Sequence, residues 1–496
     1  MTFSNVEFAF FFAAVLVVYW LLPRRASWQN GFVLLASYVF YASWNLRLLP
    51  LIWLATAVDY WAGLRIADNR PSRDAEGTPE GRAARRRMRI ALAVSLVYNV
   101  GQLAFFKYVG FFAESLNALL GAIGLPSSLP ILRLALPLGI SFYTLQKIAY
   151  VLDVYNGGQE PCRSKLTFAT FVAFFPQVVA GPIPRAHQLL PQLDAARQPS
   201  PDQWRAGAGA FLLGFVKKAY VAEYLGQMVV DPVFGAPERY TVGAHWIAIV
   251  AYAAQIFSDF SGYSDMAVGS ARFLGIELPE NFRHPFLSKS LREVWQRWHI
   301  SLNSWLFEYL YGPLTTSSGW WRGRLDLGFI AVFLISGLWH GAAWTFILWG
   351  GLHGLGLVAH RRWDEVYRGL CRKDRSYVAV RKTAGYGAAA WLLTQGFFVL
   401  SLVPFRAPSI AVARTFARGL LVSAGTTALP LVSINMAAIA AFLVTYHVVE
   451  LPFARRAWDA FLSLPAPARG FAYGLVVVYL MIFMPNASGA FIYANF

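Results

Sequence analysis

The chain has 496 residues, of which 57% are hydrophobic and only 14% are charged, and its net charge is +17. A soluble domain typically carries about 25% charged residues, so the composition excludes an ordinary soluble globular protein and indicates a polytopic membrane protein. The positive charge does not indicate nucleic-acid binding, because no recognised nucleic-acid-binding fold accompanies it and basic cytoplasmic loops beside anionic lipid account for it.

Apolar segments recur along the whole chain and predict roughly eleven to thirteen membrane segments. The first is expected to be retained rather than cleaved as a signal peptide, because no basic residue precedes it and Arg24-Arg25 follows it. The strong spans are expected at 8–22, 29–44, 48–64, 90–106, 328–358, 384–404, 431–449 and 468–485. Weaker spans are expected at 131–152, 166–181, 207–228 and 245–275.

Basic residues in short loops set the expected orientation of these spans. The basic loops are expected on the cytoplasmic side, which places both termini outside; they comprise Arg24-Arg25, 65–89, 361–382 and Arg455-Arg456. The middle of the chain has short segments interrupted by prolines such as Pro137 and Pro176. Irregular backbone at membrane depth is tolerated only where it is buried in protein or lines a cavity. The middle is therefore expected to form tilted and re-entrant helices around a cavity.

The whole chain is expected to form one membrane-embedded domain without an appended soluble domain. Within it, N-terminal helices occupy 1–125, a core occupies 126–362 and C-terminal helices occupy 363–496.

Few charged residues fall at membrane depth in the middle of the chain. Asp259 and Asp265 lie in a hydroxyl-rich stretch that could line a wet pocket or form a helix-breaking loop. Lys217 and Lys218 interrupt another apolar run. This pair could attract an anionic ligand, but two side chains that snorkel to the membrane interface explain it better.

The segment 292–313 predicts one amphipathic helix that ends at Gly312-Pro313. Helical spacing places Trp295, His299, Leu302 and Leu306 on one face, and Arg297, Ser301, Ser304 and Glu308 on another. His299 could make a structural hydrogen bond in an interfacial helix, or it could belong to a functional site.

His340 lies in the run 334–353, whose apolar, aromatic and small residues predict a membrane helix. Ionisable groups inside a bilayer are expensive and usually mark functional sites, and histidine exchanges protons readily near neutral pH. The alternative is a structural hydrogen bond to a backbone carbonyl or to Ser336, one turn earlier. His353 is rotated off the His340 face, so the two are not expected to share a metal ion. His360 is expected at the interface, and structural roles are expected for His187, His245, His284 and His447.

Several classes of chemistry lack their sequence signatures. The chain has no Walker loop, GxSxG elbow, HExxH helix or dinucleotide fingerprint in a credible context, so ATP hydrolysis, serine hydrolysis and metalloprotease activity are not indicated. Cys162 and Cys371 form no CxxC pair, so neither a disulfide nor a zinc site is expected.

Six segments in order resemble the membrane-bound O-acyltransferase (MBOAT) family, most closely its bacterial alginate O-acetylation branch. They are Ala36-Ser-Tyr-Val-Phe-Tyr-Ala-Ser-Trp44, Leu136-Pro-Leu-Gly-Ile-Ser-Phe-Tyr143, Phe174-Phe-Pro-Gln-Val-Val-Ala-Gly-Pro182, Asp259-Phe-Ser-Gly-Tyr-Ser-Asp-Met-Ala267, Glu293-Val-Trp-Gln-Arg-Trp-His-Ile-Ser-Leu302 and Gly337-Leu-Trp-His-Gly341. The resemblance covers almost the whole chain and implies an all-α fold with a central tunnel.

The resemblance implies transfer of an acyl group from a thioester to a hydroxyl. The family's invariant histidine falls on His340, which implies a general base, and a second functional position falls on His299, which implies a residue that orients the acceptor or polarises the acyl carbonyl. No permanently bound cofactor or metal is implied, and acetyl-CoA is the expected donor. Further substrate-binding or tunnel positions are expected at Ser336, Trp339, Trp298, Arg297, Asn303, Glu308, Asp259 and Asp265.

The family also implies a bacterial inner membrane, an exported polysaccharide as acceptor and a separate periplasmic acetyltransferase as partner. Transfer of D-alanine or another acyl group to a cell-wall polymer is an alternative, as is a transporter or export subunit without chemistry. This chain departs from the family's pattern after the His299 segment, at a place that bears on the assignment of the substrate. Relatives typically carry Arg-Asp and then a Gly-Gly-Asn-Arg-like turn, where this chain has Phe307-Glu308 and the turn 315–321.

Overall fold

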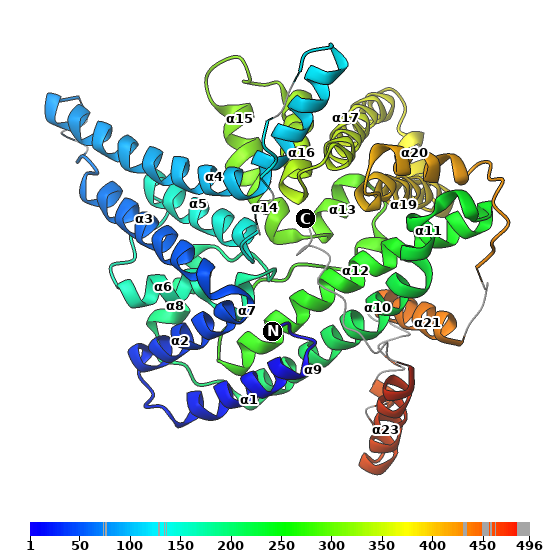
Figure 1. Cartoon of the computed structure of the whole chain (residues 1–496), viewed down its shortest axis with the longest axis horizontal. Helices are drawn as coiled ribbons and strands as arrows, with labels where there is room; N and C mark the ends of the chain where they lie inside the picture. The colour runs from blue at the N-terminus through cyan, green and yellow to red at the C-terminus, as the bar shows by residue number, and fades with distance from the viewer. Residues whose placement is uncertain are drawn as a thin grey trace. The chain divides into compact units, whose positions relative to one another are not determined.

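Helices form nearly all the regular structure of the part of the chain that is described (Figure 1). The computed structural model describes residues 1–72, 74, 77–126, 129–132, 134, 136–429, 434–448, 456, 459–461 and 463–483. Contacts divide the chain into two compact units, Met1–Leu213 with Tyr263–Glu280, and Gly214–Gly262 with Asn281–Asn495. The long helix α12 (Val242–Phe273) contributes residues to both units.

The first unit consists of apolar helices with a buried polar connection among three of them. Its elements are α1 (Val6–Leu21), α2 (Ala26–Asn45), η1 (Leu46–Leu48), α3 (Leu49–Asp68), α4 (Pro79–Ala122), α5 (Ile140–Asn156), α6 (Lys165–Ala173), α7 (Phe175–Val178), α8 (Ala186–Asp194) and most of α9 (Pro201–Phe215). Asp59 of α3 lies 3.2 Å from the Lys147 ammonium of α5, and its carboxylate accepts a hydrogen bond of 2.9 Å from Asn99 of α4. All three side chains are buried, so each charge depends on its partner.

The second unit holds both histidines that the sequence singles out. Its elements are η3 (Val216–Ala222), α10 (Glu223–Leu225), η4 (Gly226–Val230), α11 (Asp231–Gly235), η5 (Pro237–Arg239), the first part of α12, η6 (Pro285–Leu287), α13 (Leu291–Arg297), α14 (Ile300–Leu306), η7 (Phe307–Tyr311), α15 (Gly312–Thr316), α16 (Leu325–His340), α17 (Trp344–Lys373), α18 (Ser376–Arg381), α19 (Ala384–Arg406), α20 (Ile410–Gly419), α21 (Ile434–Val448) and α23 (Ala466–Phe483).

The helices agree with the predicted all-α polytopic membrane class. Three described stretches are long and apolar enough to cross a membrane, namely Ala26–Asp68, Pro79–Ala122 and Ala384–Arg406, and α1 and α16 are shorter apolar helices. The spans expected at 431–449 and 468–485 correspond to α21 and α23, while their outer residues and Arg455 lie outside the described residues. The number of spans and the three-part division of the chain stay predictions.

The expectation of one continuous helix across His340 is wrong. The chain turns after His340, and α16 and α17 pack side by side as a hairpin. Glycine makes the close approach possible: a Cβ at Gly337 would lie 2.2 Å from the Phe346 carbonyl oxygen, and one at Gly350 would lie 2.2 Å from that of Phe333. Small residues permit such contact between membrane helices, and the apolar sequence carries no ordinary turn signal.

Ion pairs join the two open ends of this hairpin. Asp326, in the first turn of α16, pairs with both Arg361 and Arg362 of α17. His340 is fourteen residues further along α16, which corresponds to roughly 21 Å at 1.5 Å per residue. The histidine therefore lies at the closed end of the hairpin, far from the basic residues.

The basic segment 361–382 is largely helical rather than a loop. α17 continues to Lys373, and α18 covers Ser376–Arg381. Arg and Lys have high helix propensity, and Arg361 forms an i,i+4 ion pair of 2.8 Å with Glu365. The helix therefore extends past the apolar part of its sequence.

Lys217 and Lys218 do not snorkel, contrary to the prediction. Both side chains are buried, and the Lys218 ammonium lies 2.9 Å from Glu223 and 2.5 Å from Asp259. The Lys217 ammonium lies 3.8 Å from the centroid of the Tyr446 ring. Carboxylates and an aromatic face close by remove the need to reach the interface. Asp259 itself lies inside the continuous helix α12, which also excludes a helix-breaking loop there.

Candidate active site

His299 lies at a break between two short helices, so the prediction of one continuous helix over 292–313 is wrong. α13 ends at Arg297, and α14 begins at Ile300. His299 between them has φ 46° and ψ 54°, a left-handed conformation that residues with a Cβ seldom adopt. Strained backbone of this kind persists where the surroundings enforce it, and it is concentrated at functional sites.

A neighbouring strand-like segment enforces the break at His299. The amide of Arg283 donates to the carbonyl of Arg297, and the amide of Ile300 donates to the carbonyl of Asn281, both at 2.9 Å. The side-chain oxygen of Asn281 also accepts a hydrogen bond of 2.9 Å from the Ser301 hydroxyl. These bonds compete with the helical ladder and replace it locally.

Asn303 secures the same break from within α14. Its amide nitrogen donates to the carbonyl of Trp298 at 2.5 Å and to the carbonyl of His299 at 3.2 Å. A residue expected to bind substrate therefore fixes the backbone that presents His299.

His340 occupies the last position of α16, directly before the turn of the hairpin. A Cβ at Gly341 would lie 2.0 Å from the Phe346 ring, so only glycine fits where the chain leaves the helix. Ser336 is one turn earlier on the same face, and both side chains are buried. The helix end thus holds the imidazole inside the protein.

Both histidines line one small space, named here the histidine cavity. Its volume is 10 Å³, about the size of a single water molecule. The lining residues come from α12, α13, α14, α16, α17 and α19: Ile256, Trp295, Trp298, His299, Leu302, Asn303, Ser336, His340, Trp349, Phe398, Leu402 and Phe405.

Aromatic rings surround each imidazole. The His340 ring lies 5.1 Å from Trp349 and 5.3 Å from Phe405, and the His299 ring lies 4.5 Å from Phe260. Trp339 stands between them, with its ring 5.0 Å from His340 and 6.0 Å from His299. Such a site excludes water, which strengthens hydrogen bonds and electrostatic interactions with a reacting group.

The structure gathers five of the predicted site residues around this cavity and leaves five off its lining. His340, His299, Trp298, Asn303 and Ser336 line it, and Trp339 packs against both histidines without lining it. The remaining four positions, Arg297, Glu308, Asp259 and Asp265, are not among the lining residues.

These four residues have identifiable positions elsewhere. Arg297 forms an ion pair of 2.8 Å with Glu293, and Asp259 forms a buried ion pair with Lys218. Glu308 is exposed in η7, and Asp265 belongs to the first compact unit. The ion pairs of Arg297 and Asp259 give these two residues structural roles.

Several residues of the site cannot be predicted from the sequence. Asn281 controls the backbone at His299 but lies eighteen residues earlier, in a segment without a recognisable motif. Trp349, Phe398 and Phe405 enclose the histidines but look like ordinary membrane-helix residues. Only the spacing of aromatic residues one or two turns apart on α19 hints at a shared face.

His353 is buried near the cavity but makes a different kind of contact. Its Nε2 lies 2.8 Å from the Ser401 hydroxyl, and its ring packs 4.8 Å from Trp349. It does not line the histidine cavity. Among the described residues, no group of three His, Cys, Asp or Glu side chains is placed to hold a metal ion.

Comparison with known proteins identifies relatives across most of the chain. The profile of the membrane-bound O-acyltransferase family matches residues 163–403, which include both histidines. The probable alginate O-acetylase of Azotobacter vinelandii is 39% identical over 362 residues, covering 73% of this chain and 69% of that protein. The corresponding protein of Pseudomonas aeruginosa is 37% identical over 424 residues, covering 83% and 73%. The peptidoglycan O-acetyltransferase of Helicobacter pylori is 33% identical over 418 residues, covering 78% and 73%.

Proposed function

The chain belongs to the membrane-bound O-acyltransferase family and is a membrane O-acyltransferase, and we propose that His340 is the general base of its reaction. The observation that carries this proposal is the meeting of His340 and His299 in one small cavity. His340 ends a helix and His299 lies between two helices, and each is held there by unusual backbone, a glycine turn in one case and a left-handed residue in the other.

The reaction begins when the acceptor hydroxyl loses its proton to the imidazole of His340. The hydroxyl oxygen forms a bond to the carbonyl carbon of the acyl thioester, giving a tetrahedral intermediate. The carbon–sulfur bond then breaks, and the departing thiolate takes the proton from the imidazolium. General-base help of this kind contributes about 10²–10⁴-fold to a rate.

His299 supports this step from the other side of the cavity. A ring nitrogen that carries a proton can donate a hydrogen bond to the carbonyl oxygen, where negative charge develops, or to the acceptor oxygen. The fixed backbone around His299 suits this role, because a donor stabilises a transition state best when it is already oriented.

We propose acetyl-CoA as the donor and an exported, alginate-like polysaccharide as the final acceptor, with the protein in a bacterial inner membrane. The names of the alginate O-acetylase relatives support this assignment. A periplasmic acetyltransferase would receive the acetyl group and pass it to the polymer. This chain then supplies the step that brings the acetyl group through the membrane.

Replacing His340 with alanine in the producing cell tests the function. The variant should insert into the membrane normally, and the exported polymer should lose its acetyl esters. His187→Gln is the control, because it removes an exposed imidazole that does not line the cavity. Wild-type ester content in the His340→Ala strain would end the catalytic proposal.

The acceptor is tested separately from the catalytic residue. Purified polymer from the wild-type strain should carry acetyl esters on uronic-acid hydroxyls, and disruption of the chromosomal copy should remove them. Esters on peptidoglycan instead would redirect the acceptor towards the activity named for the Helicobacter pylori relative.

A further inference from the structure

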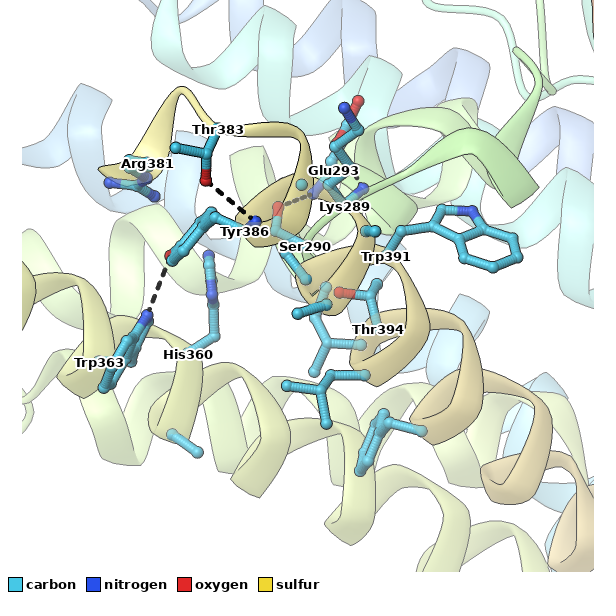
Figure 2. A pocket seen from close by; sticks show the side chains of 18 of the residues that line it. Lys289, Ser290, Glu293, His360, Trp363, Arg381, Thr383, Tyr386, Trp391 and Thr394 are labelled. Atoms are coloured by element: carbon cyan, nitrogen blue, oxygen red, sulfur yellow. Dashed lines mark hydrogen bonds between the residues drawn. The ribbon is translucent and has the colours of Figure 1, made fainter. Parts of the chain in front are cut away.

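A second cavity of 1060 Å³ lies beside the amino ends of α13 and α19. We name it the basic cavity, and its lining comes from residues 289–293, 356–363 and 381–397. Figure 2 shows Lys289, Ser290 and Glu293 at the start of α13, His360 and Trp363 on α17, and Tyr386, Trp391 and Thr394 on α19. The reaction proposed above uses none of these residues.

Small apolar residues form one part of the lining of the basic cavity, named here its floor. α19 contributes Gly387 and the three alanines 388–390, and α17 contributes Gly356 and Ala359. The rim includes Leu393, which is 76% exposed, and Trp391, which is 40% exposed. Because α19 is long and apolar enough to cross a membrane, this floor lies where lipid chains are the natural solvent.

The mouth of the cavity is cationic. It is lined by Lys289, Arg381 and Lys382, against the single carboxylate of Glu293. Both oxygens of that carboxylate are engaged, one with Arg297 at 2.8 Å and the other with the backbone amide of Lys289 at 2.8 Å. The mouth therefore presents an excess of positive charge.

Two of the three cations are available to a ligand. Arg381 pairs with Asp364 at 2.9 Å, whereas neither the Lys289 nor the Lys382 ammonium has a hydrogen bond or ion pair with any described residue. Both lysines are exposed to the mouth of the cavity.

The position of Lys289 adds a second positive feature at the same place. A Cβ at Gly387 would lie 3.4 Å from its ammonium, so this charge sits against the first turn of α19. A helix carries partial positive charge at its amino end, which makes a nearby ammonium unfavourable unless an anion lies between them. Lys289 and the start of α19 thus form two sides of an anion site.

The surrounding sequence indicates which kind of anion binds in the basic cavity. The segment 361–382 has eight basic residues against three acidic ones, a pattern that anionic lipid headgroups attract. Basic pockets between membrane helices on the cytoplasmic side are typical sites for anionic phospholipids. A soluble phosphate would leave the apolar floor uncovered, whereas a lipid satisfies both the charges and the floor.

We propose that the basic cavity binds one anionic phospholipid, with its phosphate at Lys289, Lys382 and the first turn of α19 and an acyl chain along the floor. The chain would end against Phe397, whose ring lies 5.3 Å from His353. His353 packs in turn against Trp295 and Trp349, which line the histidine cavity. A bound lipid would therefore support one wall of the active site.

Native mass spectrometry of the detergent-purified chain tests the proposal, with phosphatidylglycerol and phosphatidylcholine as probes. The wild-type chain should retain one phosphatidylglycerol and no phosphatidylcholine under the same conditions. The double variant Lys289→Gln/Lys382→Gln should weaken phosphatidylglycerol retention by about 30-fold, since each cation near a membrane surface contributes about fivefold in affinity. Equal retention of both lipids would overturn the proposal.

Two further variants separate charge from shape. Arg372→Gln/Lys373→Gln removes the same charge from the exposed end of α17, outside the cavity lining, and should leave retention unchanged. Ala390→Phe keeps every cation but fills the floor, and it should abolish retention. If the Arg372/Lys373 variant loses lipid as strongly as the lysine pair does, the binding is a general charge effect and the proposal fails.

Coenzyme A distinguishes a lipid site from a donor site. Coenzyme A should not displace the bound phosphatidylglycerol. Displacement of the lipid by coenzyme A at matched concentration would assign the cavity to the acyl donor and overturn the lipid proposal. Acyl transfer is not measured in these experiments, so their result is independent of the role of His340.

Discussion

The histidine cavity and the basic cavity are built on the same three helices, α13, α17 and α19, yet their volumes are 10 Å³ and 1060 Å³. The first is lined by tryptophan and phenylalanine rings and has no charged carboxylate or ammonium in its lining. The second has a floor of small apolar residues and lysines at its mouth. The shared helices thus support a small aromatic site and a much larger cationic site.

The difference in volume indicates different roles for the two cavities, catalysis in the smaller one and ligand binding in the larger one. The volume of the histidine cavity is about that of one water molecule, so we expect some of its lining side chains to move when substrates bind. Closure afterwards would exclude water and protect the thioester from hydrolysis. The basic cavity needs no such rearrangement, because its space is already present.

The largest expected effect comes from the histidine cavity. His340→Ala should lower kcat for acyl transfer by about 10²–10⁴-fold, because the acceptor hydroxyl loses its general base. His340→Ala/His299→Ala should be nearly as active as His340→Ala, since residues that act in one step are not additive. Initial rates with purified protein in nanodiscs measure both variants. If the rate loss of the double variant equalled the product of the two single losses, the two histidines would act in separate steps rather than in one.

A second change acts on the hairpin that carries His340. Gly350→Ala should reduce the free energy of unfolding by about 1–3 kcal/mol, because the new Cβ overlaps the Phe333 carbonyl oxygen. Thermal unfolding measures the effect. Gly351→Ala is the matched control, since its Cβ would meet only Leu334 at an ordinary 3.8 Å. Equal melting temperatures for the two variants would contradict the close packing of α16 and α17.

The left-handed backbone at His299 predicts a smaller difference. His299→Gly should be more stable than His299→Ala by about 1 kcal/mol, because glycine adopts positive φ without a Cβ penalty. The two variants should share the same low transfer rate, since both lack the imidazole. Unfolding midpoints and initial rates measured on the same preparations check this. An alanine variant as stable as the glycine variant would show that the break is not strained.

The smallest effect concerns the basic cavity. Phosphatidylglycerol should raise the unfolding midpoint of the wild-type chain by a few degrees, because a ligand that binds only the folded state stabilises it. Lys289→Gln/Lys382→Gln should lose this response, whereas Arg372→Gln/Lys373→Gln should keep it. If phosphatidylglycerol still raised the unfolding midpoint of the lysine variant, the basic cavity would not be the lipid site.

The sequence predicts which histidines form the site better than it predicts the backbone around them. His340 and His299 stand out because an imidazole in an apolar segment is expensive, and both line the same cavity. The periodicity of 292–313 nevertheless predicts one helix where the chain forms two. The break depends on hydrogen bonds to Asn281, a residue that is distant in sequence, so no local pattern reports it.

The same reason explains the hairpin at His340. Its turn is made of glycine and alanine within an apolar run, without the proline or polar residues that usually mark a turn. Only the contacts of Gly337 and Gly350 with the opposing helix show why the chain folds back. Side-chain length and polarity alone predict that Lys217 and Lys218 snorkel, because the carboxylates that pair with Lys218 and the ring beside Lys217 are brought there only by the fold.

The central claim is that His340 takes the proton of the acceptor hydroxyl, and a single-turnover assay tests it most directly. Purified wild-type, His340→Ala and His187→Gln proteins in nanodiscs would be mixed with a radiolabelled acetyl thioester and acceptor, with donor binding and transferred label measured separately. His340→Ala is expected to bind the donor but to transfer almost no label, while His187→Gln is expected to transfer it at a rate close to wild type. Transfer by His340→Ala at the wild-type rate would contradict the central claim.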